Sequence, residues 1–286
     1  MDLEKQKIRF PAVAGTFYPD KKEDLQQLVT QLLHDTKQNG IAPKALIVPH
    51  AGYVFSGAVA ASGYGLLNAR LNNPVVFLIG ASHHFLFHGA ALDPHEAFQT
   101  PLGIVPLHQA TNQQLTKAQP LFALSVDPHH REHSLEVQLP FLQTIYHNLF
   151  NIVPILLGSA STGDLQQMAD ALQPLFERPN TLFVISTDLS HYPPMETAQE
   201  TDQRVVEAIC TGDPEKLKKN LQHEANRNLP GYQTGLCGYK AVLLLQYITS
   251  HHKTARYQLI KYQNSGHSQH GSREGVVGYA AISVTL

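Results

Sequence analysis

The chain has 286 residues, of which 43% are hydrophobic and 15% are charged. Its 21 Lys and Arg residues nearly balance its 23 Asp and Glu residues, which argues against a nucleic-acid-binding protein and against a basic, membrane-binding surface. Two cysteines exclude a disulfide framework, no apolar run approaches the ~20 residues that span a bilayer, and the first residues contain no signal-peptide core, so we expect a soluble cytoplasmic protein.

The first third of the chain alternates helical patterns with short apolar runs. Leucine and valine recur at helical spacing over 23–36, which predicts an amphipathic helix. The run 45–50 predicts a buried strand, and the stretch of small residues at 56–67 predicts a tightly packed helix. Residues 74–82 form the clearest strand, because a continuous β-branched and aromatic run is typical of a strand covered on both faces. We expect 85–110 to be irregular.

The remainder of the chain continues the alternation. Further helices are predicted over 133–146 with a kink at Pro140, over 164–176 with Thr162 or Asp164 as N-cap, over 213–221 with Asp213 as N-cap, and over 236–248. Further strands are predicted over 151–158, 181–190, 256–265 and 276–286, with an irregular segment at 263–275. This pattern predicts an α/β fold: a single three-layer α/β/α domain, residues 1–286, around a mixed, largely parallel sheet.

Polar side chains follow three of the predicted strands. The chain has 17 His, more than its 12 Phe or 11 Tyr, and histidine is the commonest metal ligand. His50 follows 45–49; Ser82, His83 and His84 follow 75–80; Asp188, Ser190 and His191 follow 182–187. Ligands of open α/β sheets bind outside the carboxyl ends of the strands. If these strands are parallel neighbours, the three segments converge on one edge of the sheet and form a site.

Cys237 adds a fourth element to this site. It lies beside the start of the predicted helix that ends at 248, and a helix N-terminus stabilises a thiolate, which is both a nucleophile and a soft metal ligand. A group of two His and one Cys suits Fe, Cu or Zn. Cys210 ends an apolar stretch, and we expect it to be simply packed. The histidines expected to be solvated are His34, His129, His130, His251, His252, His267 and His270.

Several familiar catalytic and cofactor motifs are missing from the sequence. The chain contains no G-x-S-x-G elbow, no P-loop, no G-x-G-x-x-G after a strand and no C-x-x-C. A Ser-His-Asp hydrolase is therefore not predicted, and no nucleotide cofactor is expected.

Six motifs occur in order along nearly the whole chain. They are PAVAGTFYP (11–19), IVPHAGYVFSG (47–57), LIGASHH (78–84), EHSLEVQLPFLQ (132–143), VISTDLSHY (184–192) and CGYKA (237–241). Together they resemble the MEMO family, whose bacterial and archaeal members are called AmmeMemoRadiSam system protein B. The resemblance implies a fold similar to class III extradiol dioxygenases of the LigB type, and by family analogy a functional link to a radical-SAM protein.

The resemblance also implies roles for particular residues. In those dioxygenases two His and a carboxylate hold a non-haem Fe(II); His50 and His83 match the two His ligands, and Cys237 stands where the carboxylate is expected. His191 matches the acid/base histidine, with Asp188 in the same segment. The residues that would line the pocket are Tyr53, His84, His133 and Glu136. Fe(II) is the metal expected by analogy, with Cu or Zn as alternatives because a thiolate is a softer ligand than a carboxylate.

Three functions stay open on the sequence, since fold does not imply function. The first is a metal-binding, redox-active protein of dioxygenase-like architecture. The second is a non-enzymatic adaptor that binds a peptide or small molecule in the same pocket; phosphate recognition is not favoured, because Arg9, Arg70, Arg131 and Arg204 are scattered in the sequence. The third is a hydrolase or transferase in which His191 or His50 activates Cys237 as a nucleophile.

Overall fold

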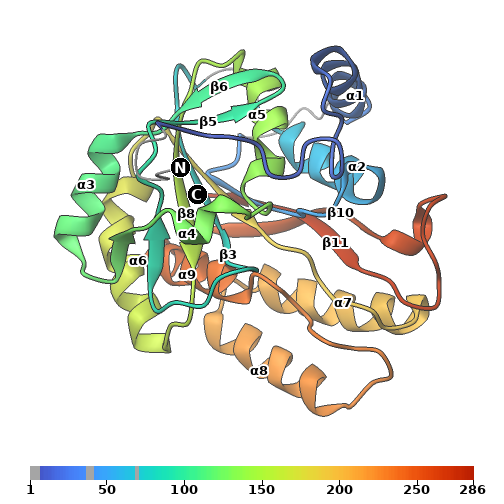
Figure 1. Ribbon diagram of the computed structural model, residues 1–286. Helices are drawn as coiled ribbons and strands as arrows, with labels where there is room; N and C mark the ends of the chain where they lie inside the picture. The colour runs from blue at the N-terminus through green and yellow to red at the C-terminus, as the bar shows by residue number, and fades with distance from the viewer. Residues whose placement is uncertain (1–6, 37–41, 68–70) are drawn as a thin grey trace.

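The computed structural model describes residues 7–36, 42–67 and 71–286, and within them the fold is built around an eight-stranded sheet with helices on both faces (Figure 1). In sheet order the strands are β10 (Arg256–Asn264), β11 (Gly278–Thr285), β2 (Ala45–Val48), β9 (Thr181–Ser186), β3 (Val75–Ala81), β8 (Asn151–Leu157), β4 (Ala90–Leu92) and β7 (Phe122–Leu124). A smaller sheet contains β1 (Ile8–Arg9), β5 (Ala97–Thr100) and β6 (Gly103–Pro106). The predicted α/β fold class is confirmed.

The centre of the large sheet is parallel. β2, β9, β3 and β8 run in one direction, with Ile47 opposite Ile185 and Ile79 opposite both Ile185 and Ile155. At one side β11 and β10 are antiparallel additions, and at the other β4 is antiparallel to β8 while β7 is parallel to β4. The sheet is therefore mixed and mostly parallel, as predicted, and the central strands end at the same edge.

Helices form a layer on each face of the sheet. One layer contains α1 (Lys22–His34), α2 (Tyr53–Tyr64) and α5 (Leu139–Tyr146); the other contains α3 (Gln109–Ala118), α6 (Thr162–Phe176), α7 (Met195–Cys210), α8 (Pro214–Asn226) and α9 (Tyr239–Thr249). The short helices α4 (Asp127–His130), η2 (Glu136–Gln138) and η3 (Ser265–His267) lie in connections. Side chains alternate across a strand, so Leu46 of β2 packs under the first layer and Ile47 under the second. Apolar residues on both faces explain the continuous hydrophobic runs of the central strands.

Two details at the helix ends differ from the sequence predictions. The N-cap of α6 is Ser161, whose side chain accepts from the Asp164 amide while Asp164 accepts from the Ser161 amide, so neither Thr162 nor Asp164 is the cap. Pro140 does not kink a helix: it lies in the first turn of α5, where a residue without an N–H leaves no helical bond unmade. The helix predicted over 133–146 therefore begins later, at Leu139.

The sequence patterns missed three short strands and one long helix. The segment 85–110, predicted to be irregular, contains β4, β5 and β6, which have only three or four residues each. Helix α7 has no counterpart among the sequence predictions. Its buried face includes the small or polar residues Ala198, Thr201 and Asp202, so an apolar stripe is weak in its first half.

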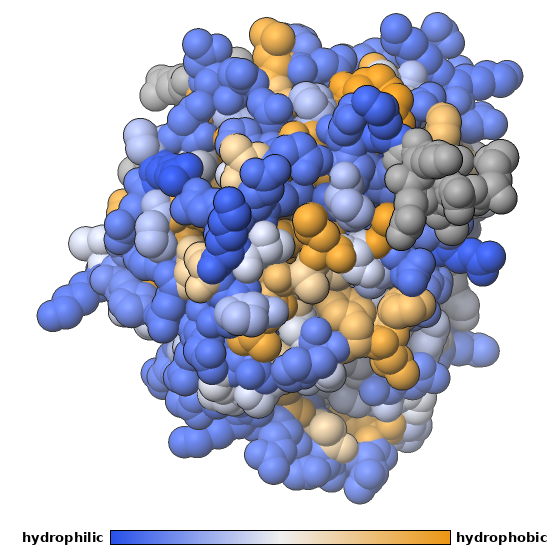
Figure 2. All heavy atoms as spheres, turned by 60° about the vertical axis from the view of Figure 1, so that its left-hand side comes forward, coloured by the Kyte–Doolittle hydropathy of each residue, from blue (hydrophilic) through white to orange (hydrophobic). Residues whose placement is uncertain are grey.

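Across 7–36, 42–67 and 71–286, none of the helices combines the length and the apolar character that a membrane crossing requires. The face drawn in Figure 2 is mostly hydrophilic, with a group of hydrophobic residues near its centre. The expectation that no signal segment is present rests partly on residues 1–6, which lie outside the described residues.

Candidate metal centre

Three neighbouring strands deliver the predicted site segments to one edge of the sheet. β2 ends at Val48, β3 at Ala81 and β9 at Ser186, and each strand is followed directly by one of these segments. β9 lies between β2 and β3, and all three are parallel. The convergence of the strand ends that the sequence predicts is confirmed, because parallel neighbours expose their carboxyl ends at the same edge.

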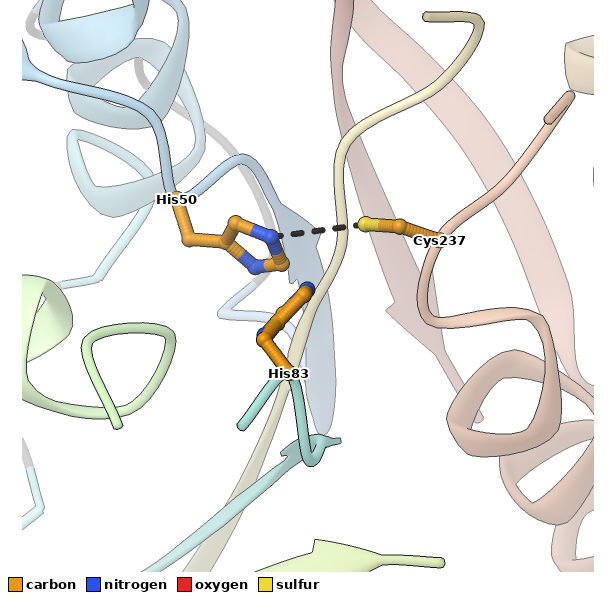
Figure 3. A group of neighbouring side chains, drawn as sticks. All are labelled: His50, His83 and Cys237. Carbon is orange, nitrogen blue, oxygen red and sulfur yellow. Dashed lines mark hydrogen bonds between the residues drawn. The ribbon is translucent and has the colours of Figure 1, made fainter. Parts of the chain in front are cut away.

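His50, His83 and Cys237 form a compact group of potential metal ligands (Figure 3). Their ligand atoms all lie within 4.8 Å of one another. The Nε2 atom of His50 lies 3.3 Å from Sγ of Cys237, and in Figure 3 the imidazole and the thiol face each other while His83 approaches from the end of β3. Three segments far apart in the sequence thus bring two nitrogens and one sulfur to one point.

The start of α9 is fixed against the end of β9, and this places the thiol. The Cys237 amide donates to the Asp188 carbonyl at 3.3 Å, and the Asp188 amide donates to Cys237 Sγ at 3.2 Å. The Gly238 amide donates to Thr187 Oγ1 at 2.8 Å. A Cβ atom at Gly238 would lie 2.7 Å from Cβ of Thr187, so only glycine permits this approach of the two backbones.

Hydrogen bonds behind the two imidazoles determine which nitrogen faces the thiol. The Ser186 hydroxyl donates to the Ser134 carbonyl at 2.6 Å and therefore accepts from Nδ1 of His50, 2.9 Å away. Nδ1 of His83 donates to Oε1 of Glu132 at 2.9 Å. Both rings carry hydrogen on Nδ1, which leaves Nε2 available as a ligand. Metal-binding histidines typically have such partners, which orient the ring and raise its basicity.

The charges of the group follow from its burial and its contacts. Burial alone would raise the pKa of the Cys237 thiol, but the charge on His50 and interactions with the His191, His50 and His83 side chains lower it well below the usual value. Burial lowers the pKa of His50, but the Asp188 carboxylate and Cys237 raise it to about 9. Burial likewise opposes ionisation of His83, but hydrogen bonds with Cys237 and Glu132 raise its pKa to about 10. The protein without a metal therefore holds a thiolate beside two imidazolium rings.

These residues fit a transition metal ion. Two imidazoles and a thiolate are a donor set for Fe, Cu or Zn, and their partners already orient them. A cation can take the place of the protons on the Nε2 atoms, since metal ligands must be deprotonated. In addition, Nε2 of His191 is buried and makes no hydrogen bond of ordinary geometry among the described residues, although the His191 side chain influences the Cys237 thiol. A buried polar atom of this kind is expected in a site that binds a further ligand.

Asp188, His133 and His84 lie around the group. Oδ1 of Asp188 accepts from the His50 amide at 2.8 Å, and burial raises the pKa of its carboxyl despite the charge on His50. The ring centroid of His133 lies 4.9 Å from that of His83 and 5.3 Å from that of His50. Burial and the charge on His50 lower the pKa of His133 to about 3, so its ring is neutral. The exposed His84 is more distant, with its centroid 6.1 Å from that of His133.

Tyr53 and Glu136 point elsewhere. The Tyr53 hydroxyl donates to the Val137 carbonyl at 2.6 Å, and its ring packs in the core. The Glu136 carboxylate accepts from Nη1 of Arg9 at 2.8 Å, from the Tyr18 hydroxyl at 2.6 Å and from two backbone amides of the N-terminal segment. All four donors belong to residues before β2, so the carboxylate of Glu136 anchors the N-terminal segment to η2.

The remaining histidines divide between surface and core. His34, His130, His251, His267 and His270 are exposed, as predicted, and His252 is half-buried. The prediction for His129 is wrong: it is 1% exposed, its Nε2 lies 3.0 Å from the Ala91 carbonyl, and its own carbonyl accepts from Nε of Arg9 at 2.7 Å. His129 is buried because Arg9 and Ala91 supply the polar contacts that its ring and backbone require.

Sequence reasoning missed Glu132 and Ser186 as supporting residues. They stand inside two of the six motifs, EHSLEVQLPFLQ and VISTDLSHY. Ser186 is the last residue of β9, so its place at a strand end was an available signal. The hydrogen bond of Glu132 to His83 joins residues 49 positions apart, and no local pattern announces it.

The chain is similar to the members of one protein family over nearly its whole length. Residues 9–283 match the family described as Memo-like protein. A MEMO1 family protein of Ignicoccus hospitalis is 32% identical over 98% of this chain and 99% of its own length, and one of Thermotoga petrophila is 34% identical over 95% and 97%. The crystal structure of an uncharacterized protein from Escherichia coli K12 superposes with a TM-score of 0.52, covering 82% of this chain and 98% of that one. At 14% identity, this last likeness concerns the fold alone.

Proposed function

The chain belongs to the Memo-like protein family, and on that premise we propose that it is a metal-binding protein in which His50, His83 and Cys237 hold a transition metal ion. The observation that carries the proposal is the meeting of these three ligand atoms, within 4.8 Å of one another, at the carboxyl edge of the sheet. The Nδ1 contacts of both imidazoles support it, because they turn Nε2 toward the thiol.

Fe(II) is the first metal to consider, by analogy with the LigB-type dioxygenases. Copper and zinc are the alternatives, because Cys237 offers a thiolate where those enzymes have a carboxylate. Three protein ligands leave coordination positions open, so a bound metal would supply a Lewis acid and, for iron or copper, a one-electron redox centre. The chain's own residues would then bind and orient the second ligand.

In this proposal access to the centre is from the side of His83. The side chain of His50 is 3% exposed, whereas that of His83 is 25% exposed and that of His133 is 17% exposed. A small molecule or a peptide side chain would enter beside these two rings. We propose that His191, whose Nε2 is buried, exchanges a proton with this second ligand.

The test is the metal content of untagged protein and of two ligand variants. His50→Ala and Cys237→Ser each remove one ligand atom, and we expect the bound metal to fall at least about tenfold in both. Cys210→Ser is the matched control, because Cys210 is a half-buried cysteine outside the group and should leave the metal content unchanged. Wild-type metal content in both ligand variants would refute this ligand set.

A second candidate function has its own observation. The lowered pKa of the Cys237 thiol and its contact of 3.3 Å with His50 Nε2 also suit a cysteine nucleophile. In metal-free protein we expect iodoacetamide to modify Cys237 faster than Cys210, whose thiol pKa is raised by burial. If Cys237 reacts no faster than Cys210, the nucleophile role is abandoned, while the metal proposal is judged by the ligand variants.

An adaptor that recognises phosphate is less favoured. Arg9 is engaged by Glu136, and Arg204 is engaged by Glu224 and Glu200. Phosphate recognition usually needs free guanidinium groups placed together. Arg70 lies outside the described residues.

A further inference from the structure

A buried carboxylate lies behind the segment that carries Asp188 and His191. Asp202 of α7 is fully buried. Its Oδ1 accepts from the Ser190 amide at 3.0 Å, and its Oδ2 accepts from the Tyr262 hydroxyl at 2.8 Å. Asp202 thus ties α7 and the edge strand β10 to the chain that leaves β9.

The space that the Asp202 carboxylate occupies exists because β11 begins with glycine. A Cβ atom at Gly278 would overlap Oδ2 of Asp202. The same glycine donates from its amide to the Ser190 carbonyl at 2.9 Å, so Ser190 is held on both sides. The contact between Asp202 of α7 and Ser190 therefore depends on the close packing of α7 against β11.

The two amides on either side of Ser190 donate to backbone carbonyls. The Leu189 amide donates to the Gly278 carbonyl at 2.8 Å, and the His191 amide donates to the Thr234 carbonyl at 3.1 Å. Within residues 188–191, Ser190 is thus the one backbone amide that the structure pairs with a side-chain carboxylate. A hydrogen bond to an ionised acceptor is stronger than one between neutral groups.

We infer that Asp202 is a positioning residue: its ionised carboxylate holds the backbone at Ser190 and thereby sets Asp188 and His191 at the metal centre. The roles of Asp188 and His191 rest on the proposed function, whereas the anchoring of the segment does not. Asp202 would touch neither the metal nor a substrate, and it would act only through Ser190.

The groups that face Asp202 decide when it is charged. They are Tyr262 from β10, His191 from the anchored segment and Tyr232 from the loop before α9, while Gly278 of β11 has no side chain. Burial raises the pKa of Asp202 to about 6, against the opposing hydrogen bonds from Tyr262 and Ser190. The carboxylate is ionised above that pH. The anchor should weaken as the pH falls below it, since a neutral carboxyl is a poorer acceptor.

The test follows the Ser190 amide resonance by NMR through a pH titration of the metal-free, full-length protein. In the wild type we expect an inflection near pH 6. Asp202→Asn keeps the shape and an acceptor oxygen but cannot ionise, so the inflection should vanish. Tyr262→Phe removes a donor that favours the ionised form, so the inflection should move to higher pH.

Glu207 of α7 provides the matched control. Glu207→Gln removes a charge from an exposed position of the same helix and should leave the Ser190 titration unchanged. An unaltered Ser190 titration in both Asp202→Asn and Tyr262→Phe would overturn the inference. Because the readout needs no metal, a wild-type protein that binds none would refute the proposed function while this titration still decides the anchor.

Discussion

The carboxylate of Glu132 holds His83 at two points: Oε2 accepts from the His83 amide at 2.7 Å and Oε1 accepts from Nδ1 of its ring at 2.9 Å. Burial would raise the pKa of Glu132, but these contacts and the charge on His83 keep it well below its ordinary value. Glu132 is therefore ionised at neutral pH. It fixes both the backbone and the ring of one proposed ligand.

Weakening this contact should weaken metal binding. Glu132→Gln keeps the shape but removes the charge, and we expect about a 10- to 100-fold loss of metal affinity, the usual effect of losing such a partner. A competition titration against a chromophoric chelator measures it. Glu177→Gln changes an exposed carboxylate and is the control. Equal affinities for all three proteins would show that Glu132 does not support the ligand.

Metal affinity should rise with pH. The pKa of His50 is about 9 and that of His83 about 10 in the protein without metal, so both imidazoles are protonated at neutral pH. A metal must displace these protons, and its apparent affinity therefore increases as the pH approaches these values. Calorimetry in buffers of different ionisation enthalpy should show proton release on binding at pH 7. Binding without proton release would contradict the charge state described here.

Changing the sulfur ligand should change the preference of the site. Cys237→Asp replaces a soft thiolate by a hard carboxylate, so we expect the ratio of Cu(I) to Fe(II) affinity to fall. Cys237→Ser, which offers neither ligand at neutral pH, should lose affinity for both. Competition between the two ions under anaerobic conditions measures the ratio. A ratio that stays constant in Cys237→Asp would argue that residue 237 does not bind the metal.

The N-terminal segment should depend on Glu136 for stability. Glu136→Ala removes the acceptor of four donors, among them Nη1 of the buried Arg9, and breaking a buried ion pair costs about 3–5 kcal/mol of unfolding free energy. Lys7→Ala removes a pair whose side chains are 76% and 61% exposed, which should cost no more than about 1 kcal/mol. Urea denaturation compares the two variants. Similar losses would mean that Glu136 is not the anchor.

The central strands and the proposed ligands could be predicted from the sequence because burial leaves a clear local pattern in these segments. β2, β3 and β9 are buried on both faces, so they appear as unbroken apolar runs, and each run ends where a polar segment begins. Cys237 could be placed because it lies two residues before the apolar helix α9. The family resemblance then linked these strand ends to one site.

Other parts of the molecule leave no local pattern in the sequence. β4, β5 and β6 are too short for a period of two to stand out, and the buried face of α7 begins with small and polar residues. Glu132 and Asp202 act through contacts 49 and 12 positions away, so their roles depend on the tertiary arrangement. His129 was expected at the surface, because the sequence does not reveal that Arg9 and Ala91 satisfy it.

The most direct measurement is anomalous diffraction from crystals of untagged, anaerobically purified protein, recorded at the iron, copper and zinc edges. We predict a single strong peak between His50, His83 and Cys237 that identifies the element. X-ray absorption of the same sample should include a sulfur neighbour at about 2.3 Å. A peak at another place in the molecule, or a metal whose coordination contains no sulfur, would contradict the account.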